Sequence, residues 1–195
     1  MKRLFAVLSV SIVAACSSMP FGGGRWTTLV DDGKGIENFN RVGDANWRVQ
    51  DGALQADRKT DKAPSYLVSK DAYGDFQLRV EFWASDDANS GIFMRCQDPK
   101  VITDKSCYEA NIFDQRPDPA YATGAIVHVA KIPQVYKVGG RWSTYDITLK
   151  GAQLDVTLNG TKTVSIRDDK FARGPLALQY GSGVVKFRKV QIRPL

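Results

Sequence analysis

The chain has 195 residues, of which 43% are hydrophobic and 25% are charged. This composition is typical of one globular domain with a sizeable core, and it excludes an intrinsically disordered protein. The formal net charge of +6 comes from 27 basic and 21 acidic residues. Two of the basic residues lie at the extreme N-terminus and the rest are interspersed with acidic ones, so we expect a mixed solvated surface and no nucleic-acid partner.

The N-terminal segment has the pattern of a secretory signal peptide, because Lys2 and Arg3 precede an apolar run that ends in small residues. The last four residues of the run, Val13-Ala14-Ala15-Cys16, resemble the bacterial lipobox, in which the cysteine becomes the lipidated first residue of the mature protein. We therefore expect a lipoprotein signal peptide over residues 1–15 and a membrane anchor at Cys16. The alternative is ordinary secretion with a chance cysteine.

No aspartate follows Cys16 in the sequence. What is known of lipoprotein sorting in Gram-negative cells then favours the outer membrane, facing the periplasm, within the bacterial cell envelope. The next residues are small, Gly-rich and uncharged, which is the composition of a flexible tether. We thus expect residues 16–24 to connect the lipid to a domain over residues 25–195.

Two further cysteines, Cys96 and Cys107, remain if Cys16 carries the lipid. In an oxidising compartment an even pair of cysteines favours a disulfide. A zinc site is the alternative reading, but two cysteines without a nearby histidine or a second pair make a poor one.

From Trp26 onward the chain has no long helical pattern and instead shows short runs of period-two alternation. In the clearest run, residues 76–83, every second side chain is apolar. Similar runs follow at residues 91–95, 109–113, 145–149, 154–158, 176–180 and 184–192. Asn159-Gly160 predicts a hairpin turn, and the polar strand after it is expected at the periphery. The pattern predicts an all-β fold with two sheets, either a sandwich or a jelly roll.

Polar and aromatic side chains alternate with the apolar ones, and they would share one face if the strands are sheet neighbours. The set is Gln77, Arg79, Glu81, Trp83, Phe93, Arg95, Glu109 and Asn111. Such a face suits a carbohydrate, with Trp83 stacking on a sugar ring and Glu81 binding hydroxyl groups. The alternative is a solvent-facing sheet with cross-strand ion pairs. The chain has no GxGxxG, P-loop or GxSxG motif to support nucleotide-dependent or serine-nucleophile chemistry.

Short motifs along residues 26–195 occur in the order and spacing of one known family. They are WRVQDGAL (47–54), YGDFQL (73–78), NSGIFMR (89–95), YEANIFD (108–114), TGAI (123–126), Trp142, LNG (158–160), GPLALQ (174–179) and VKFR (185–188). The chain resembles the bacterial 3-keto-disaccharide hydrolase domain family, also described as 3-keto-glucoside 1,2-lyase and 3-keto-2-hydroxy-glucal hydratase. The resemblance implies a jelly-roll sandwich of the concanavalin A-like lectin/glucanase type that acts on sugars oxidised to a ketone at C3.

The implied chemistry follows from the ketone, which acidifies the proton on C2. A base removes this proton, the C1 oxygen leaves by β-elimination, and water then adds to the enone, so that the net reaction is hydrolysis. Such a site needs a base near C2, a donor or a divalent metal at the C3 oxygen, and an acid for the departing oxygen. An upstream sugar 3-dehydrogenase would have to supply the substrate.

The resemblance also assigns roles to individual residues. Asn89 and Arg95 occupy polar positions of the family's Asn-Ser-Gly motif, and Glu109 and Asp114 occupy the acidic positions of its Glu-x-Gln-x-x-Asp motif. It implies Glu109 as general base, Asp114 as acid or metal ligand, Arg95 as a group that orients Glu109 or stabilises an enolate, and Asn89 as a substrate ligand. Alternatively, Asp114 caps a turn, and Arg95 and Glu109 form a plain cross-strand ion pair.

Three further positions complete the predicted site. Asn111 stands where the family has glutamine, and we expect it to bind substrate in a reshaped pocket. Val127 stands where the family commonly has an aromatic residue. The next residue, His128, is the only histidine of the chain and suits proton shuttling. Gln179 could bind substrate or backbone. The competing hypothesis for the whole chain is a non-catalytic carbohydrate-binding or structural envelope lipoprotein with the same fold.

Overall fold

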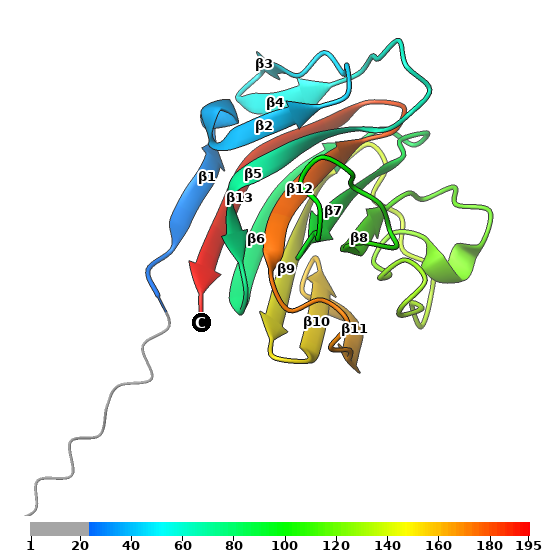
Figure 1. The fold of residues 1–195 in the computed structure, drawn as a ribbon. Helices are drawn as coiled ribbons and strands as arrows, with labels where there is room; N and C mark the ends of the chain where they lie inside the picture. The colour runs from blue at the N-terminus through cyan, green and yellow to red at the C-terminus, as the bar shows by residue number, and fades with distance from the viewer. Residues whose placement is uncertain (1–23) are drawn as a thin grey trace, which may run out of the picture.

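The computed structural model describes residues 24–195, which form two antiparallel β-sheets packed face to face (Figure 1). The predicted two-sheet β-sandwich is therefore confirmed. The predicted signal peptide, Cys16 and the tether up to residue 23 lie outside the described residues. Within residues 24–195, no helix is both long enough and apolar enough to cross a membrane.

The larger sheet has eight strands, in the order β11-β10-β9-β6-β13-β4-β3, with β1 pairing on β13. Their bounds are β1 Thr27–Asp31, β3 Arg48–Gln50, β4 Ala53–Ala56, β6 Phe76–Ala84, β9 Trp142–Lys150, β10 Gln153–Leu158, β11 Thr161–Arg167 and β13 Val185–Pro194. The hairpin predicted at Asn159-Gly160 joins β10 to β11, and both turn residues have positive φ (48° and 80°), as tight hairpin turns require. The strand β11 lies at the sheet edge, as predicted.

The smaller sheet has five strands, in the order β2-β5-β12-β7-β8. Their bounds are β2 Phe39–Val42, β5 Ser65–Tyr73, β7 Ser90–Met94, β8 Tyr108–Ile112 and β12 Gly174–Tyr180. Two short 3-10 helices, η1 (Ile36–Asn38) and η2 (Pro119–Tyr121), lie in the connections.

The main core lies between the two sheets, and alternation along each strand decides which side chains enter it. Phe76, Leu78, Val80 and Phe82 of β6 are buried there, as predicted, and so are the inward residues of β7 and β8. The ring of Phe82 stacks on Tyr145 of β9 with ring centroids 5.1 Å apart. Each such large apolar side chain contributes about 1.5 to 3 kcal/mol through burial.

A second apolar cluster lies on the outer face of the five-stranded sheet. It consists of Tyr66, Val68, Phe93, Cys96, Ile102, Cys107 and Ala177. Cys96 and Cys107 form the predicted disulfide, which closes the loop between β7 and β8. We call residues 97–106 the disulfide loop. Because Ile102 packs into this cluster, it ties the loop to the outer face of the sheet, while most of the other loop residues are exposed.

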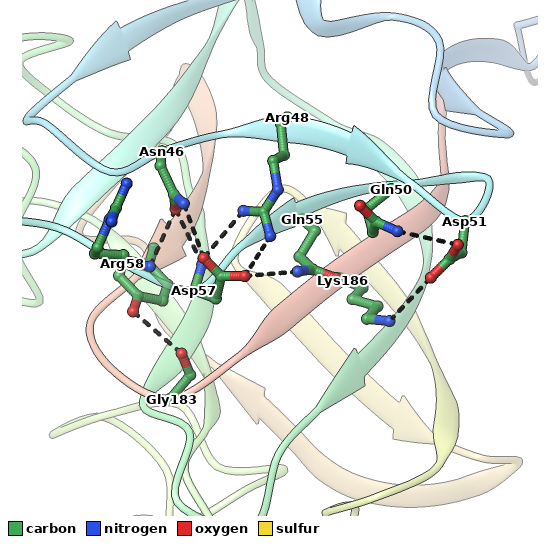
Figure 2. Close-up of polar contacts among 10 residues, drawn as sticks. Asn46, Arg48, Gln50, Asp51, Gln55, Asp57, Arg58, Gly183 and Lys186 are labelled. Atoms are coloured by element: carbon green, nitrogen blue, oxygen red, sulfur yellow. Dashed lines mark hydrogen bonds and ion pairs between the residues drawn. The ribbon is translucent and has the colours of Figure 1, made fainter.

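A polar network around Asp57 fixes the loop that follows β4 (Figure 2). The carboxylate accepts hydrogen bonds from Asn46 Nδ2 at 2.8 Å, from Gln55 Nε2 at 2.8 Å and from the Arg48 guanidinium. These contacts, first of all the one from Arg48, hold the pKa of Asp57 well below its usual range. Asp57 is thus a structural anion at the start of the loop that runs on to β5.

Candidate functional site

A pocket of about 300 Å³ opens on the outer face of the five-stranded sheet, and this volume lies at the lower end of the range for ligand sites. The residues that line it are Pro64, Tyr66, Asn89, Phe93, Ile102, Thr103, Asp104, Glu109, Arg116 and Gln179. Four strands supply its floor, because Tyr66, Gln179, Phe93 and Glu109 alternate with residues that face the core. The disulfide loop supplies one wall.

Glu109 is the acidic group of the floor, and only 6% of its surface is exposed. Burial raises the pKa of Glu109 to about 8, since a carboxylate loses hydration in such a place. The nearby Arg116 opposes this shift, and the charge of Asp104 adds to it. Glu109 can therefore exchange a proton close to neutral pH, which is the property of a general acid or base.

Gly91 makes the space for the Glu109 side chain. It lies on β7 opposite Asn111 of β8, two register positions away from the pair formed by Phe93 and Glu109. A Cβ atom at Gly91 would approach Glu109 Oε1 to 3.0 Å, Glu109 Cγ to 3.1 Å and the Phe93 ring to 3.3 Å. The missing side chain thus leaves a hollow in the sheet face over which the Glu109 carboxyl group lies.

Neutral polar groups surround the acidic one. Gln179 Nε2 lies 3.4 Å from the Tyr66 hydroxyl, and its buried Oε1 has no hydrogen-bond partner among the described residues. Burial raises the pKa of Tyr66 to about 12, so its phenol stays protonated. Asn89 is fixed through its backbone oxygen, which accepts from Gly181 N at 2.8 Å and from Ser182 N at 3.2 Å. The pocket therefore offers donors and one unused buried acceptor to a hydroxylated ligand.

The structure brings Asn89, Glu109 and Gln179 together, as predicted, but places Asn111 beneath the surface. Asn111 is fully buried, and its Nδ2 donates to the backbone oxygen of Tyr121 at 2.7 Å. It is not among the residues that line the pocket. Its amide thus holds the segment that passes beside β8.

The prediction that Arg95 acts beside Glu109, whether as a catalytic group or as its cross-strand ion partner, is wrong. Arg95 follows β7 with a φ of 52°, and this left-handed conformation turns its side chain into the protein. The guanidinium donates to the backbone oxygens of Gly74, Gly151 and Phe171 at 2.9 to 3.0 Å and pairs with Asp75 at 3.0 Å. Arg95 is therefore a buried structural residue.

Asp114 does not line the Glu109 pocket either, and its carboxylate binds groups of two other loops. Its carboxylate accepts from the Thr123 hydroxyl at 2.6 Å and from the backbone amides of Val138 and Gly139 at 2.8 and 3.0 Å. These bonds use both carboxylate oxygens. Asp114 thus ties two loops together, on the wall of a different depression that includes Asp86.

Trp83 and Glu81 lie on the opposite side of the molecule from Glu109. Their strand, β6, belongs to the eight-stranded sheet, whereas β7 and β8 belong to the five-stranded one. Strand β6 on one side, and β7 and β8 on the other, bury their apolar faces in the common core. Their outer faces therefore point in opposite directions. The expected shared face is therefore wrong. Glu81 pairs there with Arg188 at 2.6 Å, and Lys186 lies over the Trp83 ring.

His128 lies next to the pocket without lining it. Its Nε2 is 3.1 Å from Oδ2 of Asp104, which does line the pocket, and its ring centroid is 5.6 Å from that of Tyr121.

A resident metal ion does not fit the described residues. Among residues 24–195, no three His, Cys, Asp or Glu side chains gather closely enough to hold one.

Four residues of the site were missed from the sequence. Tyr66 lies in the first half of β5, where five consecutive side chains are buried and no polar alternation marks a strand. Gly91 did carry a signal, because a glycine inside a strand often marks a close approach. Asp104 and Arg116 lie in loops, where no periodicity predicts the direction of a side chain.

Residues 25–193 match the family described as the 3-keto-alpha-glucoside-1,2-lyase-like domain. The chain belongs to this family. A comparison with curated protein sequences finds no significant match. The family suggested by the sequence motifs is thus confirmed by a match over residues 25–193.

Solved structures share the fold of this 3-keto-alpha-glucoside-1,2-lyase-like domain. A predicted glycosyl hydrolase of Parabacteroides distasonis superposes with a TM-score of 0.73 at 18% identity, covering 87% of this chain and 94% of its own. A second from the same organism gives 0.69 at 26% identity, covering 88% and 100%. The carbohydrate binding module CBM66 of Bacillus subtilis gives 0.56 at 14% identity, covering 87% and 96%. Together with the family, these neighbours support a carbohydrate-active role.

Proposed function

We propose that this protein is an enzyme that cleaves 3-keto-glycosides by β-elimination, with Glu109 as its base. The observation that carries the proposal is a buried carboxyl group with a raised pKa on the floor of a ligand-sized pocket. Family membership supplies the substrate class, a sugar with a ketone at C3.

The reaction needs one base and one stabilised oxygen. The ionised Glu109 removes the proton on C2, and the electron pair of the C–H bond delocalises onto the C3 oxygen as an enolate. The enolate then re-forms the ketone, the double bond between C1 and C2 forms, and the bond from C1 to the leaving oxygen breaks. The leaving oxygen takes up the proton from Glu109, so the carboxylate is regenerated and the protons balance.

The surrounding groups fit this sequence of events. Arg116 and the Asn89 amide are the pocket's donors for the developing negative charge on the C3 oxygen. The free acceptor of Gln179 suits a hydroxyl group of the sugar. Because Phe93 and burial exclude water from the floor, Glu109 is a stronger base than an exposed carboxylate would be. Addition of water to C1 of the enone completes net hydrolysis.

The pH dependence tests the role of Glu109 as a base. Since its pKa is raised to about 8, most molecules hold the acid form at neutral pH. The value of kcat/KM should therefore rise about tenfold per pH unit below this pKa and level off above it. Initial rates measured from mildly acidic to alkaline pH check this. A profile that falls through the same range would instead assign Glu109 as the general acid.

Turnover itself tests the proposal as a whole. Protein consisting of residues 17–195 should release the aglycone from a 3-keto-glycoside and leave the unoxidised glycoside intact. The two substrates differ only in the oxidation state of C3, and the ketone is what acidifies the proton on C2, so the comparison tests whether cleavage depends on the ketone. Absence of release, also with divalent metals added, refutes the proposal.

Substitution of Gly91 by alanine tests whether the hollow under Glu109 matters. The new Cβ would press on the Glu109 carboxyl group and the Phe93 ring. Because a misplaced base loses most of its effect, we expect kcat/KM to fall by about tenfold or more. Gly74 is the matched control, since a Cβ there would meet no atom closer than 3.8 Å. Equal rates for Gly91→Ala and the wild type would show that the hollow has no role.

A carbohydrate-binding module without catalysis is the second candidate, favoured by the likeness to CBM66. It predicts sugar binding at the same pocket that survives Glu109→Gln and is lost with Gln179→Ala. A purely structural envelope protein predicts no ligand pocket, and the cavity around Glu109 argues against it.

We further propose that lipidation at Cys16 anchors the domain in the bacterial cell envelope, at the outer membrane facing the periplasm. The sequence before residue 24 supports this proposal. Metabolic labelling with a fatty acid, lost in Cys16→Ser, tests it. The ketone at C3 requires that a sugar 3-dehydrogenase act earlier in the reaction sequence.

A further inference from the structure

Asp104 is a second carboxylate of the pocket, and no sequence pattern had selected it. It lies on the disulfide loop and lines the same pocket as Glu109. Its charge acts on two groups of the floor, because it contributes to the raised pKa of both Glu109 and Tyr66. Asp104 therefore faces the floor from the wall.

His128 holds Asp104 in this place. Its Nε2 is 3.1 Å from Oδ2 of Asp104, and the side chains are 58% and 30% exposed, respectively. The residue before His128 is tied to the floor, because Val127 N donates to the backbone oxygen of Glu109 at 3.0 Å. The pair thus joins the disulfide loop to the edge of the strand that carries Glu109, with solvent on its other side.

We propose that Asp104, held by His128, is a positioning carboxylate that governs when Glu109 carries its proton. The catalytic meaning of this inference rests on the proposed function, but the electrostatic link between the residues does not. Two carboxyl groups around one pocket repel when both are ionised, so the charge on Asp104 favours the acid form of Glu109. The contact with His128 keeps the Asp104 carboxylate at the wall of the pocket.

Other charged and titratable groups face Glu109 and must be kept constant in a test. Arg116 opposes the effect of Asp104 from the wall, and Tyr66 faces Glu109 from β5. Tyr145 of β9 lies on the core side, with its pKa raised by burial. None of these residues is changed in the variants below.

The test follows the titration of Glu109 directly, by NMR of the full chain labelled at its glutamate carboxyl carbons and solubilised in detergent. The resonance is assigned by its absence in Glu109→Gln. In Asp104→Asn we expect the midpoint to fall by about half a pH unit or more, because a repelling charge is removed. In His128→Ala we expect a fall as well, because Asp104 loses the contact that holds it at the pocket wall. Asp98→Asn is the matched control, since Asp98 lies on the disulfide loop but does not line the pocket.

The outcomes separate this inference from the proposed function. An unchanged midpoint in Asp104→Asn overturns the inference, and an unchanged midpoint in His128→Ala overturns the role given to His128. If Asp104→Asn does not fold, Asp104→Ser removes the same charge and carries the same expectation. If the midpoint moves as expected and no 3-keto-glycoside is turned over, the inference stands and the proposed function fails. If both hold, the rising limb of kcat/KM moves together with the NMR midpoint.

Discussion

Replacing Glu109 with glutamine should lower kcat on a 3-keto-glycoside by about 10²- to 10⁴-fold, the usual contribution of a general base. Glutamine keeps the size and shape of the side chain but cannot accept the proton from C2. Steady-state rates at alkaline pH, where the wild-type carboxylate is ionised, give the largest contrast.

The matched control is Glu81→Gln on the outer face of the other sheet, which should leave kcat unchanged. Stability provides a second readout. The pKa of Glu109 is raised from 4.5 to about 8 in the folded protein, so the unfolded chain releases this proton first as the pH rises. The wild type therefore loses stability between these two values, and Glu109→Gln does not. The variant should unfold at a higher temperature than the wild type near pH 8, and the advantage should vanish near pH 4.5.

Replacing Arg95 with methionine should lower the free energy of unfolding by about 3 kcal/mol, which is the scale for removing one member of a buried charged network. The side chain is only 2% exposed, and methionine cannot donate to the backbone oxygens of Gly74, Gly151 and Phe171. Urea unfolding of both proteins measures the difference.

Arg79→Met is the control, because the Arg79 side chain is 49% exposed and pairs with Asp146 at the surface. Such exposed pairs contribute at most about 1 kcal/mol. A loss of stability in Arg95→Met no larger than in this control would show that the buried network is not important for the fold. At a temperature where Arg95→Met stays folded, its kcat should remain close to that of the wild type, since Arg95 does not line the pocket.

The core faces of the strands could be predicted from the sequence, because apolar residues alternate with polar ones along a strand such as residues 76–83, and the apolar ones are buried. Which of the two sheets each strand joins could not be predicted from the sequence. The strands β6 and β7 are consecutive in the chain, and the connection over residues 85–89 passes from one sheet to the other. Period-two alternation is the same in both sheets, so it carries no information on this point. The predicted shared face failed for this reason.

Individual side chains were mispredicted where the backbone leaves the regular strand. Arg95 has the parity of an outward residue, but its positive φ reverses the side chain. Asp114 lies beyond the end of β8, where parity no longer applies, and loop amides surround it. The outward direction of the Glu109 side chain could be predicted, because Glu109 lies within a regular strand between Tyr108 and Ala110, which face the core.

The disulfide loop has a consequence for where the protein can mature. The disulfide between Cys96 and Cys107 closes the loop that forms one wall of the pocket. This loop carries Asp104 and Ile102, which line the pocket beside its floor. In a reducing cytosol the sheets could assemble from their own hydrogen bonds while this wall lost its covalent tie. Protein expressed without forming the disulfide would then be folded but would lack an ordered wall at its pocket. Activity should therefore be assayed on protein that was expressed in an oxidising compartment.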